Sequence, residues 1–288
     1  MIFLSGNIRI TKHRLLRMQQ PIALIGGNIM SNQMGIELLP DERLDEVNER
    51  ITIIQKKDGL TFGTDAYFLA SFIKQQRYAH AVELGTGTGI ISLLCASKDK
   101  LGVIDAIEIQ KDFYDIAKRN AVLNGLEGRI RLICEDVRNV SSVTVGGEVD
   151  VVFTNPPYMT LDSGKRNTSD RKYIARHEVC GDIGDFCATA RRLLKHGGRF
   201  YCVWRPDRLS SLFSAMKNNG LEPKRLVFVH GDADAEPSMV LVSATKGGAE
   251  GLRILPPIFL HETDTKKDGV RQLTQRAIRI YETMDITE

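Results

Sequence analysis

Short apolar runs alternate with helical segments through the middle of this 288-residue chain, and this alternation constrains its fold more than any other feature. Nearly uniform apolar runs occupy residues 79–84, 103–109 and 149–154. Segments with helical apolar spacing lie between these runs, at residues 90–97 and 111–123. Strands that are apolar on both faces are typical of a parallel sheet covered by helices on both sides. We therefore predict an α/β fold with a mostly parallel sheet.

The same pattern extends toward both ends of the chain. We expect a small hairpin over residues 51–62 that turns at Asp58-Gly59, and then a helix over 65–74 with Thr64 as its N-cap. Further along, the spacing predicts strands at 129–134, 200–204, 226–230 and 239–244, helices at 182–195 and 208–218, and a terminal helix at 270–281.

Length and composition fit one large domain with an extension at each end. We expect residues 1–40 to be a poorly ordered extension or a misassigned start, with the natural initiator at Met30 or Met34. A basic arm that touches RNA is the alternative interpretation of this segment. Residues 41–262 are expected to form the main domain, and residues 263–288 a C-terminal helix. The first segment lacks the order of a signal peptide, and no apolar run is long enough to span a membrane.

Charge and cysteine content exclude several classes of protein. A net charge of +3 permits a nucleic-acid partner without requiring one. The five cysteines are widely spaced without a CxxC pair, which argues against a disulfide framework and against a cysteine zinc site. His177 and Glu178 are adjacent, but no second histidine stands at helical spacing, so we expect no metal. We expect a cytoplasmic protein with reduced thiols, and a monomer as the default state.

A glycine-rich turn follows the first strand of the alternating region. Gly85, Gly87 and Gly89 are spaced as GxGxG, whereas a dinucleotide fingerprint has GxGxxG. Glu83, just before the turn, would repel a pyrophosphate but suits a ligand with positive charge, such as the amino group and sulfonium of S-adenosylmethionine.

Two further acids follow the next two strands. Glu108 lies roughly 20 residues downstream of the glycine turn, where an acid can hold ribose hydroxyls. Asp136 follows the strand at 129–134 and could accept a hydrogen bond from an adenine amine. An exposed loop carboxylate is the alternative for each acid, but three acids at three successive strand ends favour one shared crevice.

The tetrapeptide Asn155-Pro156-Pro157-Tyr158 follows the strand at 149–154 directly. The two prolines stiffen the turn, so the Asn155 side-chain oxygen and the Pro156 carbonyl can be presented together as acceptors for a planar NH2 group. Tyr158 offers a flat face on which a base or an amide can stack. Orientation of the amine would supply much of the rate. The alternative is a plain proline turn with Tyr158 as a core cap.

These motifs resemble those of the class I, Rossmann-like methyltransferases, and the tetrapeptide resembles the motif of their amino-methyltransferase members. The resemblance implies S-adenosylmethionine as cofactor. It also implies a seven-stranded sheet with one antiparallel edge strand, in which residues 226–230 and 239–244 are the last two strands.

One family is matched more closely, the bacterial tRNA adenine-N6 methyltransferases that modify the adenine next to the anticodon of a valine tRNA. The segments that resemble this family are Glu49-Arg50-Ile51, Asp58-Gly59, Phe62-Gly63-Thr64-Asp65-Ala66, residues 155–158 and Ala175-Arg176-His177-Glu178. The resemblance implies that Thr64 and Asp65 lie near the methionine end of the cofactor. It further implies that the target adenine is flipped out against Tyr158.

A net basic segment after Tyr158 is the expected tRNA contact, through Lys165, Arg166, Arg171, Lys172 and Arg176. A solvated loop is the alternative. Rival functions are a glutamine N5-methyltransferase that acts on release factors, a guanine-N2 rRNA methyltransferase and, from another class, a non-catalytic RNA- or NAD-binding Rossmann protein. The rivals that methylate share the asparagine-proline motif, so the identity of the substrate rests on the resemblance.

Overall fold

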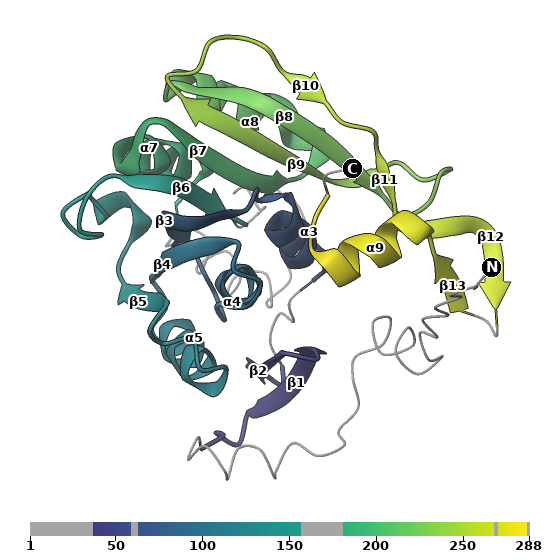
Figure 1. Cartoon of the computed structure of the whole chain (residues 1–288), viewed down its shortest axis with the longest axis horizontal. Helices are drawn as coiled ribbons and strands as arrows, with labels where there is room; N and C mark the ends of the chain where they lie inside the picture. Colours follow the sequence, from purple (N-terminus) through teal and green to yellow (C-terminus); the bar gives the residue numbers. More distant parts are fainter. Residues whose placement is uncertain (1–36, 59–62, 157–180, 268–269, 287–288) are drawn as a thin grey trace, which may run out of the picture.

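A computed structural model describes residues 37–58, 63–156, 181–267 and 270–286 of the chain. Within these residues the predicted α/β class is confirmed. Seven long strands form the central sheet in the order β8-β9-β7-β6-β3-β4-β5, and the short strands β10 and β11 pair with β8 at one edge (Figure 1). The long strands are β3 (Gln76–Leu84), β4 (Leu101–Glu108), β5 (Ile130–Cys134), β6 (Val149–Thr154), β7 (Leu194–Trp204), β8 (Leu221–His230) and β9 (Pro237–Lys246).

Strand directions match the expected sheet in all but one detail. The five strands from β7 to β5 in the sheet order are mutually parallel. The antiparallel strand is β9, which lies between β7 and β8 and pairs with both, so it is internal to the sheet and not at its edge. The edge beyond β8 is extended by β10 (Arg253–Ile254) and β11 (Ile258–Phe259), which run parallel to β8.

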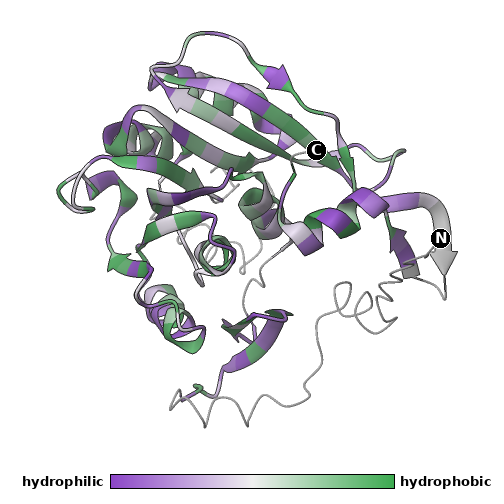
Figure 2. Cartoon of the chain, in the orientation of Figure 1, coloured by the Kyte–Doolittle hydropathy of each residue, from purple (hydrophilic) through white to green (hydrophobic). Residues whose placement is uncertain are grey.

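Helices cover both faces of the sheet, because apolar side chains project from both of its faces. One face packs against α3 (Thr64–Phe72), α4 (Ile90–Ser97) and α5 (Lys111–Leu123). The other packs against α7 (Ile183–Leu193) and α8 (Leu209–Asn218), with short 3-10 turns η1 (Val137–Asn139) and η2 (Pro206–Arg208) beside them. Apolar residues follow the strands of the central sheet (Figure 2). Successive residues of β3 point to opposite faces, since Ala81 belongs to the core beneath α3 and α4 and Val82 to the core beneath α7 and α8.

A separate hairpin, β1 (Glu42–Asn48) and β2 (Ile51–Lys56), lies beside α4 and α5 (Figure 1). Its turn is at Glu49-Arg50 and β2 pairs with the strand before it, whereas Gly59 of the predicted turn at Asp58-Gly59 lies outside the described residues. The Asn48 side-chain oxygen accepts from the backbone of Arg50 at 2.9 Å and of Ile51 at 3.0 Å, and these bonds close the turn at the earlier position.

The C-terminal region begins with a second hairpin, β12 (His261–Lys267) and β13 (Val270–Leu273), and ends with helix α9 (Gln275–Thr283). The helix predicted over residues 270–281 is therefore wrong in its first turn. Thr274 accepts from the backbone of Ala277 through its side chain and starts the helix there. Of the domain division, residues 1–36 lie outside the described residues, and the three-part division itself stays a prediction.

Two smaller details also differ from expectation. Helix α3 begins with Thr64 as its first residue and Gly63 at the N-cap, so the predicted N-cap role of Thr64 is wrong. Cys134 is exposed, whereas Cys95, Cys187 and Cys202 are buried free thiols. No helix among the described residues is long and apolar enough to cross a membrane.

Candidate active site

The glycine-rich turn joins β3 to α4 at the carboxyl edge of the parallel strands. Gly85, Gly87 and Gly89 all have positive φ, at 72°, 56° and 86°, a conformation that other residues adopt with strain. The backbone N–H groups of Gly85 and Thr86 donate to the carbonyl of Ile107 at 3.0 and 2.9 Å, which ties the turn to the end of β4. A Cβ on Gly87 would meet open space, whereas one on Gly89 would lie 3.3 Å from the Ala117 Cβ of α5. Gly89 thus permits close helix packing, and Gly87 leaves the turn open to a ligand.

Glu83 is buried beneath this turn, with 1% of its surface exposed. Its Oε2 accepts from the Thr86 hydroxyl at 2.7 Å and from the backbone N–H of Ser92 at 3.2 Å, and also from the Ser92 hydroxyl. Its Oε1 is buried without a hydrogen-bond partner. Burial, together with the nearby Glu108 carboxylate, raises the pKa of Glu83 to about 7, although the hydrogen bonds from Ser92 and Thr86 oppose the rise. An unpartnered buried carboxylate oxygen favours a ligand that brings a donor with positive charge.

Glu108 ends β4 and faces the glycine turn. Its Oε2 accepts from the Gly87 N–H at 2.8 Å and its Oε1 from the Gln110 N–H at 2.9 Å. Burial raises the pKa of this carboxyl, and hydrogen bonds from Gln110, Gly87 and Ile109 oppose that rise. The carboxylate faces the glycine turn, so it could also accept from a ribose hydroxyl of a ligand bound there.

Asp136 follows β5 at the same edge of the sheet, as the sequence predicts. Its side chain caps η1 by accepting from the backbone of Arg138 at 2.9 Å. The Arg138 guanidinium also pairs with it, and that hydrogen bond lowers the pKa of Asp136. The carboxylate is therefore ionised and an acceptor, but a ligand amine would share it with Arg138.

Asn155 follows β6 at the point where β6 lies beside β3. The two strands pair Thr154 with Leu84, and the Thr154 hydroxyl donates to the Leu84 carbonyl at 2.8 Å. This bond places the asparagine turn next to the glycine turn. The Asn155 Nδ2 donates to the Asp65 carboxylate at 2.8 Å, so the structure brings these two predicted site residues together. Pro156 is buried.

A cavity of about 680 Å³ adjoins Asp65 and lies at the ends of β7 and β9. It is lined by Trp204, Arg205, Pro206 and Met239 among others. Its volume is within the range of sites that enclose small ligands or nucleobases. The cavity gives Asp65 and its neighbours a recess into which a substrate group can enter.

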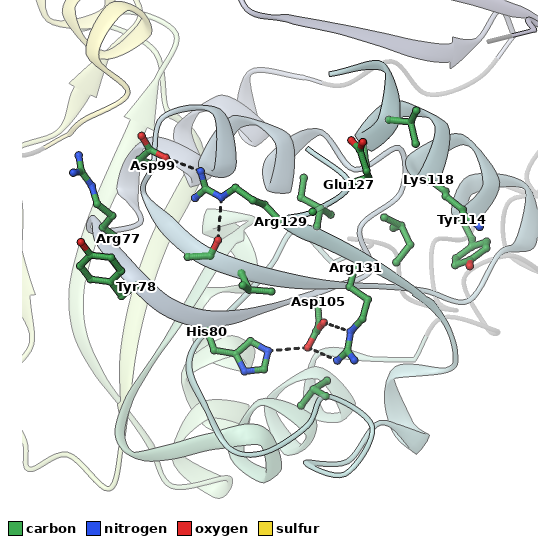
Figure 3. Close-up of a pocket in the computed structure, with 18 residues that line it drawn as sticks. Arg77, Tyr78, His80, Asp99, Asp105, Tyr114, Lys118, Glu127, Arg129 and Arg131 are labelled. Carbon is green, nitrogen blue, oxygen red and sulfur yellow. Dashed lines mark hydrogen bonds and ion pairs between the residues drawn. The ribbon is translucent and has the colours of Figure 1, made fainter. Parts of the chain in front are cut away.

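A larger cavity of about 1120 Å³ lies elsewhere, around the amino-terminal halves of β3 and β4 and the edge strand β5 (Figure 3). Its central acid, Asp105, is fully buried and already paired. Its carboxylate accepts a hydrogen bond from Arg131 Nε at 2.6 Å and pairs with His80 Nε2 at 2.8 Å. None of the predicted site residues lines this cavity, so its size does not indicate the reaction site.

Several predicted residues fall outside the described part of the chain. These are Pro157, Tyr158, Lys165, Arg166, Arg171, Lys172 and Arg176. Among the residues that the structure describes, no group of three or more His, Cys, Asp or Glu side chains could hold a metal ion. Thr64 and Asp65 begin α3, beside Asn155.

Sequence reasoning missed the polar side chains that support the site. Ser92 and Thr86 hold Glu83, as described above, and Asn120 of α5 donates to the Thr88 carbonyl of the glycine turn at 2.9 Å. Asn120 is fully buried and also bonds both backbone groups of Ile54 in β2. A polar residue on the apolar side of a helix was the available signal, since such a group needs buried partners.

Comparison with known proteins gives a consistent family. A family model for the methyltransferase small domain matches residues 56–218. A tRNA1(Val) (adenine(37)-N6)-methyltransferase from Phocaeicola vulgatus is 30% identical over 195 residues, which are 68% of this chain and 81% of that protein. The protein of the same name from Bacteroides fragilis is 29% identical over 197 residues, 68% of this chain and 82% of that protein.

Structural similarity supports the fold independently. A predicted O-methyltransferase from Agrobacterium tumefaciens aligns with a TM-score of 0.62 and 21% identity, over 78% of this chain and 98% of that one. The sheet order, the glycine turn and the matched segment agree, and this chain belongs to the methyltransferase small domain family.

Proposed function

We propose that this protein is an S-adenosylmethionine-dependent tRNA methyltransferase that acts on the N6 amine of the adenine next to the anticodon of a valine tRNA. One observation carries the proposal. The Asn155 carboxamide stands at the end of β6, beside the glycine turn of β3, with its Nδ2 bound to Asp65 at 2.8 Å. An amine acceptor thus lies next to a site suited to a cationic cofactor.

The residues at the glycine turn fit S-adenosylmethionine. Glu83 has a buried Oε1 without a partner, suited to a cationic group of the cofactor. Glu108 would accept from the ribose hydroxyls, and Asp136 from the adenine amine. Gly87 leaves open space above the turn. The bound cofactor supplies an electrophilic methyl group already activated by its sulfonium, so the protein needs to orient the amine more than to ionise it.

The asparagine turn fits a planar exocyclic amine. Asn155 directs Nδ2 toward Asp65, which leaves the carboxamide oxygen on the side away from Asp65. That oxygen and the carbonyl of the buried Pro156 would accept the two N–H groups of the amine and point its lone pair at the methyl. We propose that Pro157 keeps the turn stiff and that Tyr158 stacks on the base.

The choice of an adenine in tRNA is supported by the relatives, since their names specify adenine 37 of tRNA1(Val). The cavity beside Asp65 could take the flipped base, because it adjoins Asn155 through that carboxylate. The basic residues Lys165, Arg166, Arg171, Lys172 and Arg176 would contact the phosphate backbone. A tRNA substrate implies a cytoplasmic enzyme, and a monomer stays our default expectation.

The proposal is tested by methyl transfer. Purified protein is incubated with S-adenosylmethionine that carries a labelled methyl and with tRNA from a strain that lacks the protein, and the RNA is digested to nucleosides. We expect the label in N6-methyladenosine. Release factor and rRNA are offered in parallel, and label in either of them without label in tRNA would transfer the function to the corresponding rival. Asn155→Ala should remove turnover while S-adenosylhomocysteine still binds.

A further inference from the structure

The orientation of the Asn155 carboxamide decides whether it can serve an amine at all. A substrate NH2 group only donates while its lone pair attacks, so it needs an oxygen from Asn155. An asparagine can present either its oxygen or its own NH2 to the substrate, and its two orientations differ only in their hydrogen bonds. Asp65 contacts one end of this carboxamide at 2.8 Å. A carboxylate accepts and does not donate, so the end that faces Asp65 must be the NH2.

We propose that Asp65 is a positioning residue that fixes the Asn155 carboxamide in the orientation that offers its oxygen to the substrate amine. This role differs from the cofactor contact that the family resemblance implies for Asp65, and the two roles predict different effects of an Asp65 substitution on cofactor affinity. It rests on the proposed amine methylation and adds a residue to it.

The Asp65 carboxylate is itself held in place from several directions. Its Oδ1 accepts from the backbone N–H of Ala66 at 2.9 Å, which leaves Oδ2 for Asn155. The whole helix α3 is anchored as well. Tyr281 of α9 packs edge-to-face against Tyr67 and Phe68, with ring centroids 5.3 and 5.8 Å apart. A rigid support of this kind is what keeps a catalytic group in one orientation.

The far end of α3 is anchored by a buried lysine. Lys100 Nζ donates to the carbonyls of Ala70 and Ser71 at 2.7 and 3.1 Å, and to the carbonyl of Met284 at 2.8 Å. These bonds cap the last turn of α3 and join it to the end of α9. The middle and the last turn of the helix that carries Asp65 therefore contact the C-terminal region.

Gly63 gives independent support for this role. Its backbone is extended, with φ −104° and ψ 179°, so any residue could adopt it. A Cβ on Gly63 would nevertheless lie 2.6 Å from Asp65 Oδ1, and its next contacts are also with Asp65. Because Gly63 has no side chain, the Asp65 carboxylate has room to fold back to the position from which it reaches both Ala66 and Asn155.

The decisive experiment exchanges the two side chains. In Asp65→Asn, the side chain at residue 65 has only one oxygen to accept from both the Ala66 N–H and the Asn155 NH2. If its new NH2 faces Asn155, it needs the Asn155 oxygen as acceptor and so turns the Asn155 carboxamide around. In Asn155→Asp, two carboxylates face each other. In the double variant Asp65→Asn/Asn155→Asp, the donor and the acceptor are restored in exchanged places, and an oxygen again faces the substrate. We expect kcat to fall about 10- to 1000-fold in each single variant. The double variant should recover at least about tenfold over either of them.

Binding separates this role from cofactor binding. The S-adenosylhomocysteine affinity of Asp65→Asn, measured by calorimetry, should stay within about twofold of wild type, with an unchanged KM for tRNA. Gly63→Ala should lower kcat in the same way, because its methyl displaces the carboxylate without changing either functional group. Gly128→Ala is the matched control, since a Cβ there meets nothing within 4 Å and φ is not positive.

Two results would overturn the proposal. One is a double variant no faster than the faster of the two single variants. The other is an Asp65→Asn protein that binds S-adenosylhomocysteine about tenfold more weakly but turns over at the wild-type rate when saturated, which would make Asp65 a cofactor ligand. Failure of the proposed function is a different result, because wild-type protein would then not methylate adenine in tRNA at all.

Discussion

The buried carboxyl of Glu83 should make both cofactor affinity and stability depend on pH near neutrality. Burial raises its pKa from 4.5 to about 7. A cationic ligand group beside its unpartnered Oε1 would favour the ionised form, so affinity should increase as pH rises toward and through 7. Between pH 6 and pH 8 the ionised fraction of a group with this pKa rises from about a tenth to about nine tenths. We therefore expect S-adenosylhomocysteine to bind about tenfold more tightly at pH 8 than at pH 6.

Stability of the ligand-free protein should change in the opposite direction. The folded-state pKa is higher than the unfolded one, so this group's contribution to stability is fully present below pH 4.5 and is lost as pH rises through about 7. A pKa difference of this size corresponds to about 3 kcal/mol. The Glu83→Gln variant keeps an oxygen for Thr86 and Ser92 but carries no charge. It should therefore be more stable than wild type at pH 7.5 and nearly equal to it at pH 4.5.

The assay compares wild type with Glu83→Gln, because titrations elsewhere in the protein are common to both. Calorimetry at pH 6, 7 and 8 gives the affinity, and denaturant unfolding over pH 4.5 to 7.5 gives the stability. The variant should bind S-adenosylhomocysteine about 10- to 100-fold more weakly at pH 8, the loss expected for one charge-assisted hydrogen bond. Equal affinity of the two proteins at pH 8, or the same pH dependence of affinity in both, would refute the role assigned to Glu83.

Three further predictions concern Glu108, Asn120 and Asn124. Glu108→Ala should weaken S-adenosylhomocysteine at least about tenfold in calorimetry, because the Gly87 N–H loses its acceptor and the ribose loses its contact; unchanged affinity would contradict the ribose assignment. Asn120→Ala should lower the Tm by about 6 to 12 °C, since it leaves backbone groups of Ile54 without partners at a cost of about 3 kcal/mol. Asn124 makes the same pair of bonds to the backbone of Thr52 but is half-buried, so Asn124→Ala should lower the Tm by less than half as much, and the reverse order would count against the Asn120 assignment.

The strands, the glycine turn and the site acids were predictable because they depend on local pattern and on topology. Apolar runs at the right spacing predict parallel strands, and parallel strands bring their carboxyl ends to one edge. Glu83 and Glu108 therefore lie near each other at the glycine turn, and Asp136 follows the neighbouring strand β5 at the same edge of the sheet. Their roles toward the cofactor stay predictions.

The details that the sequence did not predict depend on side-chain hydrogen bonds and on pairings between distant residues, which local sequence patterns do not show. The hairpin turns at Glu49-Arg50 because the Asn48 oxygen supplies the turn's hydrogen bonds, whereas Asp58-Gly59 has the stronger local turn signal. The contact of Asp65 with Asn155 joins residues 90 positions apart, and no local pattern encodes it. Likewise, Val270 and Leu273 have a spacing that suits a helix, yet they form β13 because β12 pairs with it.

The most direct test of the account uses an unmodified transcript of valine tRNA. Wild-type protein and S-adenosylmethionine with a labelled methyl should place one methyl on the N6 of adenine 37, the position given in the names of the relatives. A transcript in which a purine without the exocyclic amine replaces that adenine should take no label. Label at another nucleotide, or equal label in the transcript without the amine, would contradict the proposed substrate and the role of Asn155 as acceptor for its amine.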